Sequence, residues 1–245
     1  MAKPEWYLLS YQKAMTASSS EEGREPSFAT DENIQTWWRA AGNQPGEWIS
    51  MDLDEVKDVR AVQINFADDK IDAPLPGERQ GERYIDPSQH KTRWLLEASA
   101  DGTNYFVLAG KSDAETNLPH DFIVKEEGVQ IRYLKLTVFE VPYNQNPCIS
   151  GLRVFGLGNG EKPSAPQYQA ERTGTMDMRI TIEPQTDAVG YNVLWGFAPD
   201  KLYHSCMTFM PEQNIGALVE GETVYVRVDA FNENGITEGT VRPLA

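Results

Sequence analysis

Cysteine is nearly absent from this chain of 245 residues, which contains only Cys148 and Cys206. The two residues form no C-x-x-C pair and no zinc-ligand spacing. One lies in each half of the chain, so a disulfide between them would tie the two halves together. Because free cysteine behaves as a small buried hydrophobe, we expect two buried thiols, with a disulfide as the alternative.

Positive charge is also scarce, since 22 Lys and Arg stand against 37 Asp and Glu and give a formal net charge of −15. Binding to nucleic acid needs clustered Lys and Arg that neutralise phosphates, so we expect no nucleic-acid partner. An excess of one charge keeps a protein soluble. It also suits a neutral or cationic partner, and a neutral polysaccharide would meet that condition.

Residues 1–18 contain no long apolar run, so we expect neither a signal peptide nor a membrane span there. Pro4 and Trp6 follow Met1 closely, as in a chain that begins within a longer protein. We therefore expect this sequence to be a fragment of a longer protein, with Met1 and Ala2 foreign to the natural chain.

Catalytic motifs are missing as well. The sequence has no G-x-S-x-G elbow, no H-E-x-x-H and no G-x-x-x-x-G-K-[ST] phosphate loop. The three histidines, His90, His120 and His204, are far apart in the sequence. With so many carboxylates, a pair at glycosidase distance arises by chance and carries no weight. We expect this chain itself to be non-catalytic.

The chain is rich in strand patterns. Residues 29–53 begin with a polar turn, continue through Trp37 and Trp38, and end on the alternating strand GEWISMDL. The order A-x-D-x-N-x-x-T-x-W followed by W-I-x-x-D-L resembles the opening of discoidin-like (factor V/VIII type C) domains. This resemblance implies a jelly-roll β-sandwich in which Trp38 is a core residue. Because consecutive residues of an extended segment point to opposite faces, Trp37 should then point outward or toward a neighbouring domain.

The resemblance continues along the first half of the chain. Residues 93–105 predict a hairpin that turns at Asp101-Gly102, and residues 128–141 and 149–156 predict two further strands. Trp48 and Trp94 are expected in the core or in a hairpin. Between the strands, residues 67–91 form a long segment without a period, as functional loops often do. The resemblance covers residues 8–157.

A second domain is predicted after a Gly/Pro-rich linker at residues 158–166. We therefore expect an all-β protein with a discoidin-like (galactose-binding-like) jelly roll at residues 1–157 and a second β-sandwich at residues 167–245. Residues 218–235 resemble a fibronectin type III domain. The corner tyrosine of that family is replaced by Val224, so its hydrogen bond is either absent or made differently by Tyr225.

The discoidin-like resemblance also implies a possible structural Ca²⁺ ion in the opening loop, because oxygen ligands in a tight loop suit a hard cation. The matching positions are the side chains of Asp31 and Thr36 and the carbonyls of Phe28 and Asn33. The family's last ligand, a Glu, is replaced by Gly151. The alternative is that Asp31 and Thr36 only hold the turn through hydrogen bonds.

Sugar binding is the other implication. Aromatic faces stack on sugar C–H groups, while planar polar side chains bind the hydroxyls. In discoidin-like carbohydrate modules the ligand lies on loops at one end of the barrel, here residues 18–27, 68–93 and 141–148. The loop PYNQNPC, with an aromatic and three amides in four residues, is either such a site or ordinary turn chemistry. The candidate ligands are Arg24, Asp68, Tyr84, His90, Arg93, Tyr143, Asn144 and Asn146, with Arg83 and Gln145 in the same loops.

The order of the two domains resembles the C-terminal accessory region of family 43 glycoside hydrolases of the β-xylosidase and arabinofuranosidase group. This resemblance implies a non-catalytic piece of a secreted, periplasmic or cell-surface enzyme acting on plant polysaccharide such as xylan or arabinoxylan. Its partners would be a polysaccharide or oligosaccharide and an upstream catalytic domain of the same polypeptide. In the alternative, both domains are spacers or buttresses for that catalytic domain and bind no sugar.

Overall fold

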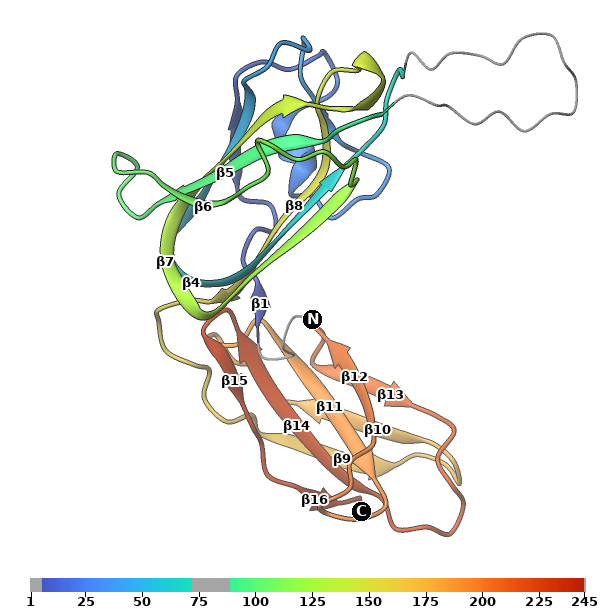
Figure 1. The fold of residues 1–245 in the computed structure, drawn as a ribbon. Helices are drawn as coiled ribbons and strands as arrows, with labels where there is room; N and C mark the ends of the chain where they lie inside the picture. Colours follow the sequence, from blue (N-terminus) through green and yellow to red (C-terminus); the bar gives the residue numbers. More distant parts are fainter. Residues whose placement is uncertain (1–5, 72–88, 245) are drawn as a thin grey trace, which may run out of the picture. The chain divides into compact units, whose positions relative to one another are not determined.

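The computed structural model describes residues 6–71 and 89–244, which form two compact units (Figure 1). The first unit spans Leu8–Gly156, and the second consists of residues 157–244 with Trp6 and Tyr7. The described residues are almost all in strands and loops, which confirms the predicted all-β fold. Their helices are two short 3-10 turns, η1 (Pro26–Ala29) and η2 (Pro142–Asn144), and none is long and apolar enough to cross a membrane.

The first unit contains one continuous sheet that folds around its own core. Its main path runs in the order β1-β8-β4-β7-β5-β6, while β2 pairs with β4 and β3 pairs with β8. The strands are β1 (Tyr7–Leu8), β2 (Ala14–Ala17), β3 (Trp38–Arg39), β4 (Glu47–Phe66), β5 (Arg93–Ser99), β6 (Phe106–Gly110), β7 (His120–Glu140) and β8 (Cys148–Leu157).

Two very long strands, β4 and β7, dominate this sheet. They pair antiparallel with each other from Glu47↔Val138 to Asn65↔His120, and the register shifts between Asp52 and Lys57 and again between Val59 and Ala61. The strand GEWISMDL predicted from the sequence forms only the first part of β4. Irregularities of this kind bend a strand and increase its twist, and Figure 1 shows β4 and β7 curving along their length.

The core of the first unit follows the predicted alternation. Ile49, Met51 and Leu53 of β4 are at most 1% exposed. Trp38 is fully buried, as predicted, and its indole N–H lies 3.0 Å from both the Ser19 carbonyl and the Ser20 hydroxyl. Burial of such a ring needs a partner for its N–H, so the loop before β3 is fixed from inside the core.

The predicted hairpin is present as β5 and β6. The Asp101 carboxylate accepts hydrogen bonds from the backbone N–H groups of Thr103 and Asn104 and from the Asn104 amide. These bonds hold the pKa of Asp101 well below its usual range. Gly102 has a φ of +76°, the left-handed conformation that favours glycine. The turn chemistry therefore matches the Asp-Gly signal in the sequence.

The second unit has two sheets, of order β13-β10-β9 and β12-β11-β14-β15, with β16 paired to β14. Their inward residues form one core, which includes Met178, Ile180, Val193, Val226 and Val228. The strands are β9 (Tyr168–Arg172), β10 (Met178–Ile182), β11 (Gly190–Gly196), β12 (His204–Thr208), β13 (Glu212–Ile215), β14 (Tyr225–Asn232), β15 (Gly235–Thr237) and β16 (Arg242–Pro243).

A buried tyrosine of β9 holds the backbone of this unit together. The Tyr168 hydroxyl lies 2.7 Å from the Val226 carbonyl and 2.6 Å from the Thr240 carbonyl. Burial raises the pKa of Tyr168 to about 12, so the hydroxyl keeps its proton for these carbonyls. Val224 is buried. Tyr225 is the alternative donor expected from the sequence for the corner hydrogen bond. In the structure, the hydroxyl that bonds to the β14 backbone is that of Tyr168.

Both cysteines are free thiols, one in each unit. The Cys148 thiol is buried and donates to the Asn146 carbonyl at 3.3 Å. Burial raises the pKa of Cys148 to about 12. Cys206 is only half-buried, so the expectation of two buried thiols holds fully for Cys148 alone.

We predict that Tyr168→Phe destabilises the second unit by about 1–3 kcal/mol, because it leaves buried carbonyl groups without their hydroxyl donor. Hydrogen exchange of the β14 amides in the full chain measures this local opening free energy. Tyr203→Phe is the matched control, since Tyr203 is 74% exposed. Exchange at β14 that is equally slow in Tyr168→Phe and in the parent would contradict the role assigned to the hydroxyl.

Candidate functional site

The loops between strands meet at one end of the first unit. The Gln145 side chain is almost fully buried there and joins two of them. Its carbonyl accepts from the Asp69 backbone N–H at 3.1 Å, and its amide donates to the Asp68 carboxylate at 2.7 Å. The loop at residues 141–147 is therefore locked to the segment that follows β4. Gln145 is a connector between loops and not an exposed ligand.

Asn146 has a similar structural role. Its amide donates to the Ala40 carbonyl at 2.8 Å. This bond fixes the loop before β8 against the loop after β3, so the Asn146 amide takes part in a contact within the protein.

Tyr143 and Asn144 are presented differently. They are consecutive residues with φ of +58° and +51°, in the left-handed region that is uncommon for residues other than glycine. The Tyr143 ring lies 4.1 Å from the His90 ring, centroid to centroid, with 40° between their planes. Strained conformations of this kind cluster at binding sites, where surrounding contacts maintain them. The geometry presents an aromatic pair at the surface.

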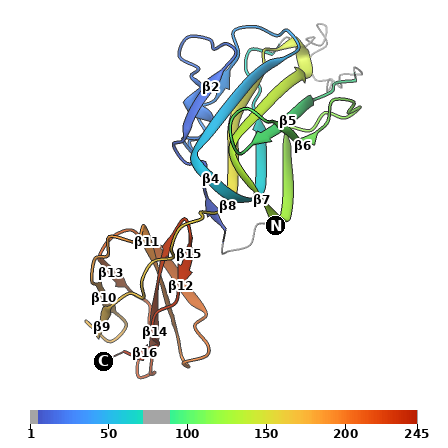
Figure 2. The same cartoon turned by 90° about the vertical axis from the view of Figure 1, so that its left-hand side faces the viewer.

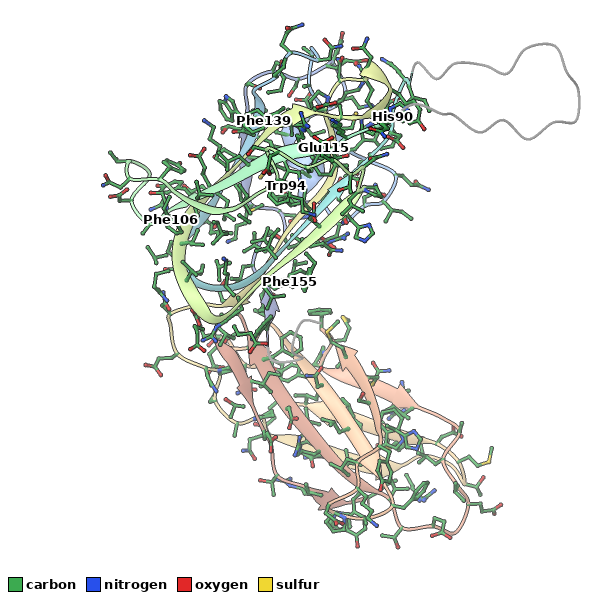
Figure 3. The ribbon with its side chains drawn as sticks, viewed as in Figure 1. His90, Trp94, Phe106, Glu115, Phe139 and Phe155 are labelled. Carbon is green, nitrogen blue, oxygen red and sulfur yellow. The ribbon has the colours of Figure 1, made fainter. Side chains whose placement is uncertain are left out.

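Asn144 is exposed and its neighbour across the loop end is Asn43. The Asn43 amide donates to the Asn144 side-chain oxygen at 3.0 Å and lies 3.2 Å from the Asn144 carbonyl. A shallow cleft of about 200 Å³ opens beside this pair, and its lining includes Gln44, Phe139 and Glu140. Figure 3 labels Phe139 and His90 at this same end of the unit. Asn43, Gln44 and Phe139 are not among the ligands predicted from the sequence. The segment GNQPG, a Gly/Pro loop with two amides, is the available signal for the first two.

Trp37 lies at the loop end in a polar setting. The Arg24 guanidinium lies 3.9 Å from the centroid of its ring, and the indole N–H donates to the Asp69 carboxylate at 3.0 Å. Arg24 and Asp69 also form an ion pair at 3.4 Å. Trp37 is half-buried under Arg24 rather than facing fully outward, and the Arg24 guanidinium is engaged by protein groups.

Arg93 is engaged even more fully. Its guanidinium donates to the Ala114 carbonyl at 2.8 Å and pairs with Glu115 at 2.7 Å and with Glu140 at 3.2 Å. These bonds fasten the segment after β6 to β5. Arg93, a candidate ligand in the sequence, is therefore held by three contacts within the protein.

The structure therefore divides the predicted ligands into three groups. It brings together His90, Tyr143 and Asn144 at the loop end, where Asn144 is exposed and the two rings are half-buried. It uses Arg24, Asp68, Arg93 and Asn146 in contacts within the protein. Tyr84 and Arg83 lie outside the described residues. The first group is the candidate site, with Asn43 and the adjoining cleft.

Residues 14–75 match the family model of the F5/8 type C domain. The matched segment contains η1, Trp38 and the whole of β4, so it includes the opening loop and strand from which the discoidin-like domain is predicted. The F5/8 type C prediction is confirmed for this part of the chain. No match to the chain is found among curated proteins.

Solved structures of carbohydrate-binding modules are similar to the first unit at low identity. CpGH89CBM32-4 of Clostridium perfringens, in complex with GlcNAc-α-1,4-galactose, is 16% identical over 64% of this chain and 98% of its own, with a TM-score of 0.48. Chitosan-binding module 1 of the chitosanase/glucanase of Paenibacillus sp. IK-5 is 18% identical over 61% of this chain and 99% of its own, with a TM-score of 0.46. Module 2 of the same enzyme, in complex with chitotriose, is 17% identical over 60% and 99%, with a TM-score of 0.46.

The loop in which the F5/8 type C resemblance places calcium is held by its own side chains. One oxygen of the Asp31 carboxylate accepts from the Asn33 backbone N–H at 2.8 Å, and the other lies 2.6 Å from the Thr36 hydroxyl. That hydroxyl is also 2.9 Å from the Asn33 carbonyl. Asp31, Asn33 and Thr36 are thus brought together as predicted, and hydrogen bonds join them directly. Phe28 lies in the adjoining turn η1.

At Gly151, which replaces the Glu of the family, the neighbouring side-chain groups are hydrogen-bond donors. A Cβ on Gly151 would lie 3.1 Å from the Asn65 amide nitrogen and 3.7 Å from the Arg153 guanidinium carbon. Arg153 donates to both carboxylate oxygens of Glu32 in the loop, at 2.8 and 2.9 Å. Among the residues that the structure describes, no group of three or more His, Cys, Asp or Glu is placed to hold a metal. The guanidinium of Arg153, beside the position where the family has a Glu, would repel a cation held there. We propose that the loop is held without calcium.

We predict that adding calcium or EDTA leaves the melting temperature of the chain unchanged, because no ligand-linked stabilisation is available. Arg153→Gln should lower the melting temperature by about 1–3 °C, as expected for a partly exposed ion pair of about 0.2–1 kcal/mol. Arg179→Gln is the control, because its ion pairs at 3.6–3.7 Å are long and exposed. A rise in melting temperature with calcium that Asp31→Asn abolishes would contradict this proposal.

Proposed function

We propose that the first unit binds carbohydrate at its loop end, with Tyr143 and His90 as the aromatic surface and Asn144 and Asn43 as hydrogen-bonding partners. The observation that carries this proposal is the pair of rings, His90 and Tyr143, at 4.1 Å, with Tyr143 in the left-handed conformation. An aromatic face binds the apolar C–H side of a sugar, while amides both donate to and accept from its hydroxyls. The adjoining cleft of about 200 Å³ adds further amide and carboxylate groups.

The charges around the site favour a neutral sugar. Arg24 is paired with Asp69, and Arg93 is paired with Glu115 and Glu140. A net charge of −15 on the chain repels anionic polymers at long range. Recognition would therefore rest on stacking and on hydrogen bonds to hydroxyl groups. Xylan, arabinan and galactan offer this chemistry.

We further propose that the chain is a non-catalytic accessory region of a secreted glycoside hydrolase that acts on plant polysaccharide such as xylan or arabinoxylan. The domain order supports this proposal, with an F5/8 type C domain followed by a second unit of two packed sheets. That second unit would be a fibronectin type III-like spacer. Tethering would raise the local concentration of polymer at an upstream catalytic domain even when the affinity of the module is weak.

The alternative function is structural, with both units serving as buttresses or spacers for an upstream domain. Exposed apolar side chains at and just after β12 favour it, since Met207, Phe209 and Met210 are all more than 60% exposed. Exposed apolar groups that gather in one place often mark contacts with another protein. Trp37 gives this alternative no support, because Arg24 covers its ring.

We predict that Tyr143→Ala weakens retention on the preferred polymer by about tenfold, and that His90→Ala has a smaller effect in the same direction, because each removes part of the stacking surface. Affinity electrophoresis of the full chain in gels containing xylan, arabinan or galactan measures this retention. Tyr203→Ala, an exposed tyrosine of the second unit, should behave as the parent. Equal retention of Tyr143→Ala and the parent would contradict the loop-end site, and no retention on any polymer would favour the structural alternative.

A further inference from the structure

A groove of about 300 Å³ lies on the outer face of the sheet in the first unit, and it shares no lining residue with the loop-end cleft. Its size is at the lower end of the range of ligand pockets, about 300–1,000 Å³. The strands involved, β2, β4, β7 and β5, are neighbours in the sheet (Figure 2). Its lining consists of Thr16, Trp48, Ser50, Glu97, Tyr105 and Lys135.

The floor of the groove is one row of polar residues fixed by strand register. Thr16 is opposite Ser50, Ser50 is opposite Lys135, and Lys135 is opposite Glu97. Their neighbours along the strands, such as Leu136, are core residues, so the period of two makes this row face outward. Three interstrand spacings of about 4.8 Å give the row a length of about 14 Å. A chain of several sugar rings could lie along it.

Aromatic side chains form the sides of the groove. Trp48, expected from the sequence in the core or in a hairpin, is half-buried on the outer face of the sheet. The Lys135 ammonium lies 5.1 Å from the centroid of its ring. Tyr105, directly before β6, is 39% exposed. Burial raises the pKa of Tyr105, and the nearby Tyr133 and Glu97 raise it further, so its hydroxyl remains a donor.

We propose that this groove is a second carbohydrate-binding site, which takes an internal stretch of a neutral polysaccharide. Trp48 would stack on a pyranose ring, and Ser50, Glu97 and Lys135 would bind hydroxyls along the floor. Lys135 has a flexible stem, so its ammonium can swing from the ring of Trp48 to a sugar oxygen. An uncharged ligand fits because Lys135 and Glu97 oppose each other across the strands, and the net charge of −15 disfavours an acidic polymer.

The groove and the loop-end cleft would have different preferences. The cleft is small and bordered by loops, which suits a single ring, whereas the groove crosses four strands in the open and suits a chain. The groove proposal does not depend on the loop-end proposal. Binding at both would hold one polymer through two weak contacts, which raises avidity without any new contact.

Calorimetry of the full chain with hexasaccharides of xylan, arabinan and galactan tests the groove directly. The parent should bind two hexasaccharide molecules, and Tyr143→Ala should retain one bound at the groove. Trp48→Ala and Tyr105→Ala should each weaken that remaining event by about tenfold when added to Tyr143→Ala, because each removes stacking surface. Glu97→Gln should weaken it as well, since it removes a charged acceptor.

Folding controls keep the outcomes distinct. If Trp48→Ala lowers the melting temperature, the groove is tested with Tyr105→Ala alone. Tyr105 is partly exposed at the rim of the groove, so its replacement should not affect folding. Loss of all binding in Tyr143→Ala would overturn the groove and leave the loop-end site intact. Binding that survives Tyr143→Ala but is lost in Trp48→Ala would support the groove. A parent that binds none of the three hexasaccharides, or a Trp48→Ala variant that changes only self-association in sedimentation, would overturn it.

Discussion

The antiparallel ladder between β4 and β7 is the interaction on which the first unit depends. These strands pair along nearly their whole length, through two changes of register, so a single pair of strands supplies backbone partners on both sides of the bend. Each other strand that the structure describes in this unit pairs with β4, with β7 or with one of their direct neighbours, because β2 and β8 pair with β4 and β5 pairs with β7. The outer polar row of the groove and the inner apolar core are two faces of the same ladder. A slip of one residue would exchange those faces.

The loops at the end of the unit are ordered by side chains rather than by secondary structure. Gln145 joins the residues after β4 to the loop before β8, and the Trp38 indole holds residues 19 and 20 from the core. Each of these buried polar groups has a hydrogen-bond partner. Such bonds add little to the free energy of unfolding when formed, but removing one partner leaves a buried polar group unsatisfied, which is costly. They leave Tyr143 and Asn144 at the surface in a conformation that would be unfavourable in a free peptide. The rigidity of the site thus originates in residues that need not touch a ligand.

The sequence predicts the parts of the fold that depend on local pattern. Alternation identifies Ile49, Met51 and Leu53 as core, and the Asp101-Gly102 signal identifies the hairpin, because both depend on neighbours within a few residues. The roles of polar loop residues cannot be read in this way. Asn146 bonds to Ala40 and Gln145 bonds to Asp68, and both partners are distant in sequence. The sequence alone does not distinguish an amide that bonds within the protein from one that binds a ligand. The groove depends on the register of four strands, which the pattern of each strand alone does not contain.

The position of β8 has a mechanical consequence. This strand begins at Cys148, directly after the loop that carries Tyr143, and ends at Leu157, where the chain passes to the second unit. A pull between a polymer held at the loop end and the rest of the polypeptide would therefore act along the axis of β8. β8 pairs with β4, β1 and β3, and hydrogen bonds between antiparallel strands lie perpendicular to the strands. A force along β8 would therefore load these hydrogen bonds in shear and simultaneously, instead of breaking them one after another.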